Sequence, residues 1–294
     1  MNTLRANYKA VFLFTFPALA LFTVIVVYPL IQIFYKSMFE WDGITTGKFL
    51  FLDNYKNLMQ DSIFFTAIKN GLIFASILTV FQLGLGTVLA LALMNKKMVG
   101  RNLLRRVYFL PVVLSVAVVC QLWISMYNPM YGLINKLFEL LHLSYRQDWL
   151  SSPGLSSIIA VTFVSSWQYL GYQFALIYAG AKSIPEQYFE AAKIDGASTF
   201  KTHLKVTIPL LAETYKMCLI FALVGGLNAF AHMQIMTKGG PGTATYTLTY
   251  LMYRSAFVVN DFGYGCAVAV MLVLECLLVT IVVNRLVARD RISY

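Results

Sequence analysis

The sequence predicts an all-α membrane protein, a bundle of about six transmembrane helices with a short helical segment at one end. Hydrophobic residues make up 59% of the 294 residues and charged residues only 12%, whereas an average soluble domain has about 25% charged residues. Apolar runs of about 20 residues recur along the chain, and each is long enough to cross a hydrocarbon core about 30 Å thick. Lysine and arginine gather between some of these runs and not between others.

The apolar runs define six expected spans within one domain that covers residues 1–294. The first run is too long for the apolar core of a signal peptide and shows no small-residue cleavage site, so we expect it to remain as a span. Gly84 and Gly86 in the second run are expected to allow close helix packing. The spans are expected at residues 11–34, 67–94, 107–127, 155–181, 212–233 and 264–287.

The basic residues predict the orientation of the bundle. Most of the 23 lysines and arginines lie in the two termini, after the second span, and between the fourth and fifth spans. Short loops rich in Lys and Arg stay in the cytoplasm. We therefore expect both termini and residues 183–209 to be cytoplasmic. The net charge of +10 is then typical of a membrane protein and does not indicate a nucleic-acid partner.

The sequence carries no motif of an enzyme active site. It has no phosphate-binding loop of the form GxxxxGKS or GxxxxGKT, no HExxH zinc motif and no GxSxG nucleophile motif. The three histidines are scattered, and the four cysteines lie inside apolar runs without a CxxC pair. We expect no catalytic residue, no metal site and no cofactor bound by this chain. Any energy input must come from a partner or from an ion gradient.

Residues 183–209 form the longest polar-to-amphipathic stretch between two apolar runs. Ser183 is expected to cap a first short helix, with Glu186 at capping-box spacing. Gly196 is expected to end that helix, because glycine readily takes the left-handed conformation of a helix stop. A second helix is expected at residues 198–206. The two helices would form a compact knob on the cytoplasmic side.

Three short motifs give this segment a family resemblance. They are Glu190-Ala191-Ala192, Asp195-Gly196-Ala197 and Ile208-Pro209-Leu210, and they resemble the EAA loop of bacterial ABC-importer permeases. Residues 237–242 and Tyr28-Pro29-Leu30 resemble the carbohydrate-uptake branch of that family, the maltose and glycerol-phosphate permease type. The resemblance extends over nearly the whole chain, which lacks the large periplasmic insertion of the maltose permease.

The resemblance implies a transport subunit that is not itself an enzyme. In that family the EAA loop is a coupling helix that docks on an ATPase subunit, so two ATPase subunits would use ATP and Mg²⁺ on the cytoplasmic side. A second, homologous permease subunit would complete a heterodimer, and an extracellular solute-binding protein would deliver a sugar. The complex would lie in the bacterial cytoplasmic membrane. The implied ATPase-coupling residues are Glu190, Ala191, Ala192, Asp195, Gly196 and Ala197.

Four polar or aromatic residues inside the spans are candidates for contact with the substrate. Proteins bind sugars in concave sites through hydrogen bonds and through aromatic faces. The same residue types also form helix–helix hydrogen bonds or an aromatic belt at the membrane surface, and the sequence leaves both roles open. The candidates are Gln121, Gln168, Tyr172 and Asn228.

Glu275, near the middle of the sixth span, keeps an alternative function open. An acidic side chain inside a span must face the bundle or a cavity, where it is paired, protonated or part of a proton relay. A proton relay would fit a gradient-driven secondary carrier, which inverted repeats would support, and the sequence shows none. A membrane acyl- or glycosyltransferase is a further alternative, and it would need a catalytic His or Asp constellation that the sequence lacks. The sequence therefore favours the sugar permease.

Overall fold

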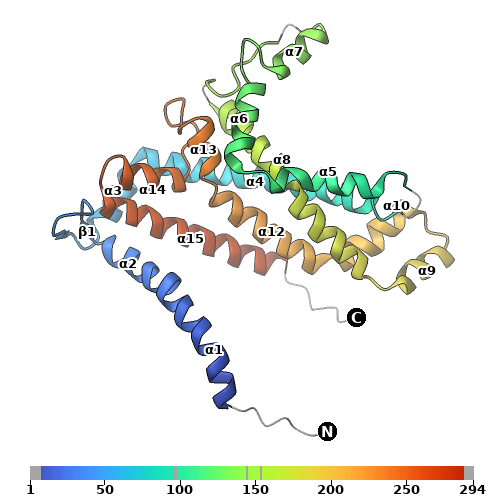
Figure 1. The fold of residues 1–294 in the computed structure, drawn as a ribbon, viewed down its shortest axis with the longest axis horizontal. Coiled ribbons are helices and arrows are strands. Elements are labelled where there is room, and N and C mark those ends of the chain that lie inside the picture. Colours follow the sequence, from blue (N-terminus) through green and yellow to red (C-terminus); the bar gives the residue numbers. More distant parts are fainter. Residues whose placement is uncertain (1–7, 96–97, 144, 153, 288–294) are drawn as a thin grey trace. The chain divides into compact units, whose positions relative to one another are not determined.

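The computed structural model of the chain is almost entirely helical (Figure 1). It describes residues 8–95, 98–143, 145–152 and 154–287. The chain divides into two compact units, one made of Met1–Asp61 with Met252–Met271 and the other of Ser62–Leu251 with Leu272–Tyr294. Helices α14 (Leu248–Phe257) and α15 (Phe262–Leu286) contribute residues to both units.

The first unit begins with a helical run of three pieces, α1 (Tyr8–Phe22), the π-helix η1 (Thr23–Val27) and α2 (Tyr28–Lys36). The wide π-turn comes just before Pro29, which has no N–H and whose ring would clash with a carbonyl one turn earlier in a regular α-helix. Val11–Lys36 has the length and apolarity of a span, and none of the side chains in its apolar window is buried. This run corresponds to the expected first span.

A short hairpin and a helix complete the described N-terminal part of the first unit. Strands β1 (Phe39–Glu40) and β2 (Lys48–Phe49) pair antiparallel. In the turn, the Asp42 carboxylate accepts two backbone N–H groups, and these bonds lower the pKa of Asp42. Helix α3 (Asp53–Gln60) follows, and its buried Asn54 side chain donates to the backbone carbonyls of Ser37, just before β1, and Phe39, in β1. The hairpin is thereby fixed to α3.

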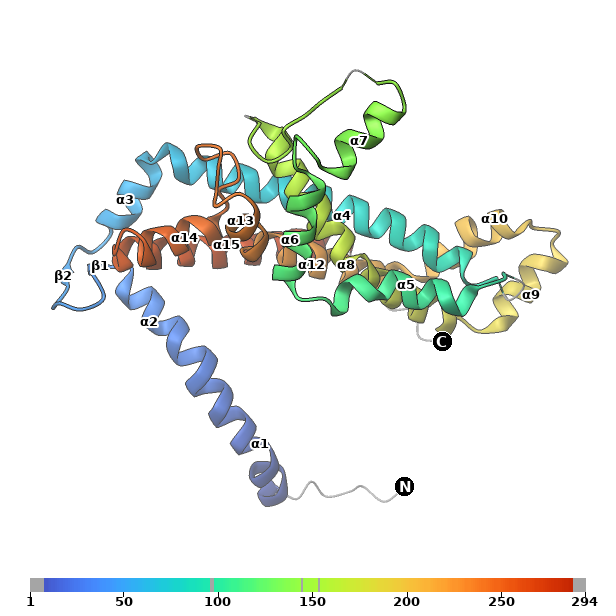
Figure 2. The same ribbon diagram turned by 45° about the horizontal axis from the view of Figure 1, so that its top comes forward.

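Three helices form the centre of the second unit. These are α4 (Ser62–Ala92), α8 (Leu155–Ser183) and α12 (Ala212–Leu227), and α5 (Arg101–Val113) packs along α8 (Figure 1, Figure 2). In a membrane, helices associate through close packing and hydrogen bonds, because lipid tails are as apolar as the side chains that they replace. Small residues at the contacts are therefore expected.

Glycines provide the closest approaches between these helices. A Cβ added to Gly226 on α12 would lie 2.7 Å from the Cα of Ala75 on α4, and one added to Gly86 would lie 3.3 Å from the backbone nitrogen of Phe174 on α8. The packing prediction for Gly86 is confirmed. The prediction for Gly84 is wrong within this chain, because no atom from another helix lies within 4 Å of the position its Cβ would take. Gly84 is two residues from Gly86, so it points to another side of the helix.

Four helical stretches within the described residues, two of which join several elements, are long and apolar enough to cross a membrane. They are Val11–Lys36, Ser62–Ala92, Ala212–Met236 and Phe262–Leu286, and each overlaps an expected span. The 29 residues of α8 match the expected fourth span in length, but serine, threonine and glutamine side chains make α8 less apolar than the other four. The helix-bundle class is confirmed, and the number of six spans stays a prediction.

The third expected span is made of two helices that meet at a sharp bend, and its status as one span stays a prediction. Helices α5 and α6 (Val116–Met126) meet at 99°, and the pair counts as one span only if the bend is accepted. The break lies at Leu114 and Ser115, where ψ is 143° and 142°. Pro111 has no N–H to donate and favours an ending here. The Ser115 hydroxyl accepts the N–H of Val118 at 3.4 Å and caps α6.

The remaining helices are short. Helix α7 (Leu133–Leu140) lies in the loop between the third and fourth expected spans. The other short elements are α9 (Glu186–Ile194), α10 (Thr199–Thr202), the π-helix η2 (His203–Thr207), α11 (Ile208–Leu210) and α13 (Ala231–Met236). The π-turn of η2 precedes Pro209 as η1 precedes Pro29, and the same missing N–H accounts for both.

Candidate functional site

The fifth expected span is interrupted at residues 228–230, between α12 and α13. A helix break at membrane depth frees backbone groups, which must find partners in the protein or line a cavity. The Asn228 side chain donates to the carbonyl of Val224 at 2.9 Å, and this carbonyl at the end of α12 also accepts the backbone N–H of Asn228. The carbonyl of Ala229 accepts the hydroxyl of Thr249 at 2.7 Å. The break is thus held by side chains.

A cleft of about 680 Å³ opens beside this break. No aspartate, glutamate, lysine or arginine is among the described residues that line it. Its polar groups are amides, hydroxyls and one imidazole, set in an apolar and aromatic wall, which is the composition of a site for a neutral polar ligand. The polar and aromatic lining residues are Gln82, Ser165, Tyr169, Tyr172, Gln173, Phe221, Asn228, Phe230 and His232.

Two tyrosines of α8 form an aromatic pair at the cleft. The rings of Tyr169 and Tyr172 are stacked, with centroids 6.3 Å apart and an interplanar angle of 16°. Tyr172 is 53% exposed, so part of its ring is free to contact a ligand. The ring of Tyr169 also meets the His232 imidazole edge-on at 6.1 Å. An exposed aromatic ring beside hydrogen-bonding groups can pack against the C–H face of a sugar.

Gln168 lies behind this wall and is fully buried. Its side-chain nitrogen donates to the carbonyl of Leu114 at 3.1 Å, and its side-chain oxygen lies 3.0 Å from Nε2 of His232. His232 is only 3% exposed, although it belongs to the cleft wall. Gln168 therefore reaches the cleft through His232 and does not line it.

The structure brings two of the four substrate-path candidates to the cleft. Tyr172 and Asn228 line it, whereas Gln168 is one hydrogen bond removed. Gln121 on α6 is exposed and is not part of the lining. Sequence reasoning missed His232 because an isolated histidine gave no signal without its neighbours in space. The substrate-path roles themselves stay predictions.

In the segment 183–209, α9 ends as expected at Gly196. This glycine has a φ of +69°. Its N–H bonds to the carbonyl of Lys193, and the N–H of Ala197 bonds to the carbonyl of Ala192. These two bonds form a Schellman motif, in which glycine avoids the steric cost of the left-handed conformation. The turn between α9 and α10 is thereby fixed.

The expected start of this segment needs correction. Ser183 does not cap α9, because α8 continues through Ser183 and the Ser183 hydroxyl donates back to the carbonyl of Gly180 at 2.8 Å. Helix α9 begins at Glu186, directly after Pro185, whose side chain makes no capping bond. The second helix starts as expected at Ser198, whose hydroxyl accepts the N–H of Lys201 at 3.4 Å.

The predicted coupling residues differ in exposure. Ala192 is buried against this chain, so its small size serves packing within the subunit. Ile194 was not predicted, yet its side chain is 86% exposed at the end of α9. An exposed isoleucine next to small and acidic residues offers a partner an apolar contact. Glu190, Ala191, Asp195 and Gly196 are exposed, and Ala197 is partly buried.

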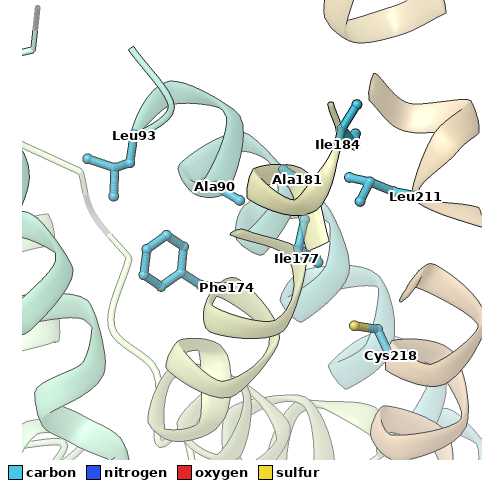
Figure 3. Close-up of a cluster of buried hydrophobic side chains, with 8 residues drawn as sticks. All are labelled: Ala90, Leu93, Phe174, Ile177, Ala181, Ile184, Leu211 and Cys218. Atoms are coloured by element: carbon cyan, nitrogen blue, oxygen red, sulfur yellow. The ribbon is translucent and has the colours of Figure 1, made fainter. Parts of the chain in front are cut away.

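Both ends of the segment are anchored in one buried apolar cluster (Figure 3). Ile184 precedes α9 and Leu211 precedes α12, and both are packed with side chains of α4 and α8. Close-packed interiors transmit displacement because they cannot compress. A force on α9 and α10 would therefore act on α8 and α12, the helices that carry the cleft. The cluster consists of Ala90, Leu93, Phe174, Ile177, Ala181, Ile184, Leu211 and Cys218.

A helical bundle with a cleft at a broken span and an anchored, exposed helix pair is typical of a membrane transport subunit. The chain belongs to the family of binding-protein-dependent transport system inner membrane components, whose family model matches residues 82–292. This confirms the resemblance of the sequence to ABC-importer permeases. Subunits of this family are permeases and not enzymes, which agrees with the lack of catalytic motifs.

Two curated relatives and one solved structure illustrate the similarity. A "Probable ABC transporter permease protein" of Pyrococcus horikoshii is 34% identical and covers 92% of this chain and 93% of its own. The multiple sugar-binding transport system permease protein MsmF of Streptococcus mutans is 35% identical over 83% of each chain. A bacterial alginate ABC transporter, solved with an alginate pentasaccharide-bound periplasmic protein, has a TM-score of 0.81 at 20% identity, with 94% of this chain and 93% of that chain covered. At that identity the structural match concerns the fold.

Proposed function

We propose that this chain is a permease subunit of an ATP-driven carbohydrate importer and that a neutral sugar or oligosaccharide passes through the cleft at the break of the fifth span. The observation that carries the proposal is the chemistry of the cleft, where amides and an exposed tyrosine ring stand in a wall without charged side chains. Amide groups bond hydroxyls, and the ring packs against C–H groups. The relative from Streptococcus mutans, named for multiple sugars, supports this substrate class.

The break in the fifth span also suits transport by alternating access. Permeases of several folds place substrate at interrupted helices, where free backbone groups add to the polar contacts. In the present chain the cleft is lined by residues of α4, α6, α8, α12 and α13 and by the break at residues 228–230. Movement of α8 and α12 as rigid bodies would open the cleft first to one side of the membrane and then to the other.

The segment 183–209 would receive the energy for this movement. Its exposed residues Ala191 and Ile194 would dock on an ATPase subunit, with Glu190 at the rim. When two ATPase subunits close on ATP and Mg²⁺, they would displace α9 and α10. Because Ile184 and Leu211 are packed against the bundle, this displacement would move α8 and α12 as well. A second, homologous permease subunit would supply the other wall of the path. A solute-binding protein would load it from outside.

The experiment that tests this function is transport in proteoliposomes. The chain is reconstituted with its cognate partner permease, ATPase and binding protein, and uptake of neutral and acidic sugars is measured with ATP inside. We expect uptake of a neutral sugar, and this uptake should require both ATP and the binding protein. Uptake that continues without ATP and stops when the proton gradient is collapsed would support the secondary carrier with Glu275 and overturn the proposal.

A variant in the same assay tests the coupling segment. Gly196→Pro cannot reach a φ of +69°, because proline fixes φ near −65°, and it also removes the N–H that bonds to Lys193. We expect ATP-driven uptake to fall to background in Gly196→Pro, with normal membrane insertion. Gly196→Asn is the matched control, since asparagine tolerates this conformation, and it should keep most of the uptake. Equal uptake by the two variants would argue against the docking role.

A further inference from the structure

The side chain of Gln168 joins two helix breaks that are distant in the sequence. The carbonyl of Leu114 belongs to the break between α5 and α6, and it accepts the Gln168 amide at 3.1 Å. His232 lies on α13, directly after the break at residues 228–230, and its Nε2 is 3.0 Å from the Gln168 oxygen. One residue in the middle of α8 therefore contacts both interrupted spans.

The direction of these hydrogen bonds is fixed by the carbonyl at one end. A backbone carbonyl can only accept, so the Gln168 group that faces Leu114 is the NH₂ group. The Gln168 oxygen then faces His232, and because this oxygen also only accepts, the proton of the imidazole must be on Nε2. The chain of donors runs from His232 through Gln168 to Leu114. In the neutral imidazole, Nδ1 is then the nitrogen without a proton.

Gln168 has no room for direct contact with a substrate in this arrangement. Its exposed fraction is 0%, and both ends of its amide are already engaged. Removal of a buried hydrogen-bonding partner leaves the other group unsatisfied, which costs more than the bond contributes. Such a network defines one arrangement of the elements that it joins.

We propose that Gln168 is a positioning residue that holds the breaks of the third and fifth spans in one fixed arrangement and keeps His232 in the Nε2-protonated form. This inference rests on the proposed function only in taking the cleft as the transport path. Val116, which follows the first break, and His232, which follows the second, both line the cleft. The width of the cleft between these residues is then set by Gln168.

An exchange of the two side chains tests the link. Gln168→His and His232→Gln each break the donor chain, and we expect each to lower the transport rate of the complete reconstituted complex about tenfold. In the double variant, an imidazole at 168 can donate to Leu114 and accept from the amide at 232, so the rate should return to within about threefold of the original. The KM for the sugar-loaded binding protein should change less than about twofold in all three variants. If the transport rate of the double variant fell by the product of the two single losses, the two side chains would act independently and the proposed link between them would be wrong.

A spectroscopic measurement tests the same link without a transport assay. It also does not depend on whether the exchanged side chains at positions 168 and 232 fit into the structure. In the ¹⁵N spectrum of the histidine-labelled complex, His232 should show the Nε2-protonated form in the original protein and a mixture of tautomers in Gln168→Leu. Gln173→Leu is the matched control, because Gln173 on the same helix donates instead to the carbonyl of Cys218 at 3.3 Å, and it should leave the His232 signal unchanged. An unchanged signal in Gln168→Leu would refute the positioning role. A complex that does not take up sugar but passes this test would refute only the proposed function.

Discussion

Asn228 serves two purposes at one position. Its side-chain nitrogen closes the end of α12 by donating to Val224 at 2.9 Å, and it also lies 3.4 Å from Sγ of Cys276. At the same time the residue lines the cleft and is exposed. An amide that ends a helix is held in place by the backbone, so a ligand that bonds to it meets a prepositioned group. Such a group binds at a lower entropic cost than a flexible side chain does.

This position leads to a prediction at the residue scale. Asn228→Ala removes both a helix-end bond and a cleft amide, and we expect sugar transport to fall by about fivefold to tenfold, with unchanged binding of the ATPase subunits. Gln121→Ala is the control, because Gln121 is exposed on α6 and outside the cleft, and it should stay within about twofold. Uptake and copurification of the ATPase are measured for both. If Gln121→Ala lost as much transport as Asn228→Ala, the cleft would not be the path.

The polar residues of the path show how far single residues could be interpreted from the sequence. Asn228 and Tyr172 were predicted because an amide or a tyrosine inside an apolar run needs a partner or a ligand. The same argument selected Gln168, yet its partners are the Leu114 carbonyl and the His232 side chain. The sequence offers no means to distinguish such internal partners from a ligand. His232 becomes meaningful only beside Gln168, which is 64 residues away in the chain.

Among the elements, α4 and α12 are joined through a glycine pair that allows a matched comparison. Gly225 and Gly226 are neighbours and both line the cleft. A Cβ on Gly226 would stand 2.7 Å from the Cα of Ala75, whereas a Cβ on Gly225 would meet nothing within 4 Å. The same added methyl group therefore collides with backbone at one position and fills open space at the other.

From this difference we predict the effect on the stability of the helix pair. Gly226→Ala must push α12 away from α4, and overpacking of this kind costs about 1–3 kcal/mol, so the solubilised subunit should unfold at a temperature lower by several degrees. Gly225→Ala should unfold at or slightly above the original temperature, because alanine favours a helix over glycine by about 1 kcal/mol. Thermal unfolding in detergent measures both. Similar melting temperatures would contradict the close contact between α4 and α12.

At the element scale, the sequence located the spans but not their interruptions. Length and apolarity define a span, and these were sufficient for the runs that became α4, α12 and α15. The bend at Leu114 and the break at residues 228–230 depend on partners from another helix, above all the Gln168 amide. Proline at 111 gave a local hint for the first break. The second break has no proline, and its local signals are the Gly225-Gly226 pair and Asn228.

For the whole molecule, the orientation in the membrane can be argued from the length of α8. A helix of 29 residues is about 43 Å long at 1.5 Å per residue, which exceeds a hydrocarbon core of about 30 Å. The loop that contains α7 precedes α8 and the α9–α10 segment follows it. If α8 spans the membrane, the two must therefore be on opposite sides. The excess of lysine and arginine then predicts a cytoplasmic position for α9.

Cysteine labelling in intact cells tests this orientation. In a background with the four native cysteines replaced by serine, Glu139→Cys on α7 and Gln187→Cys on α9 both introduce an exposed thiol. A membrane-impermeant maleimide should label Glu139→Cys in intact cells and label Gln187→Cys only after the membrane is permeabilised. The cysteine-free chain serves as the control for background reaction. Labelling of Gln187→Cys in intact cells would place the α9–α10 segment outside, where no ATPase subunit could reach it, and both the orientation and the coupling role would then be wrong.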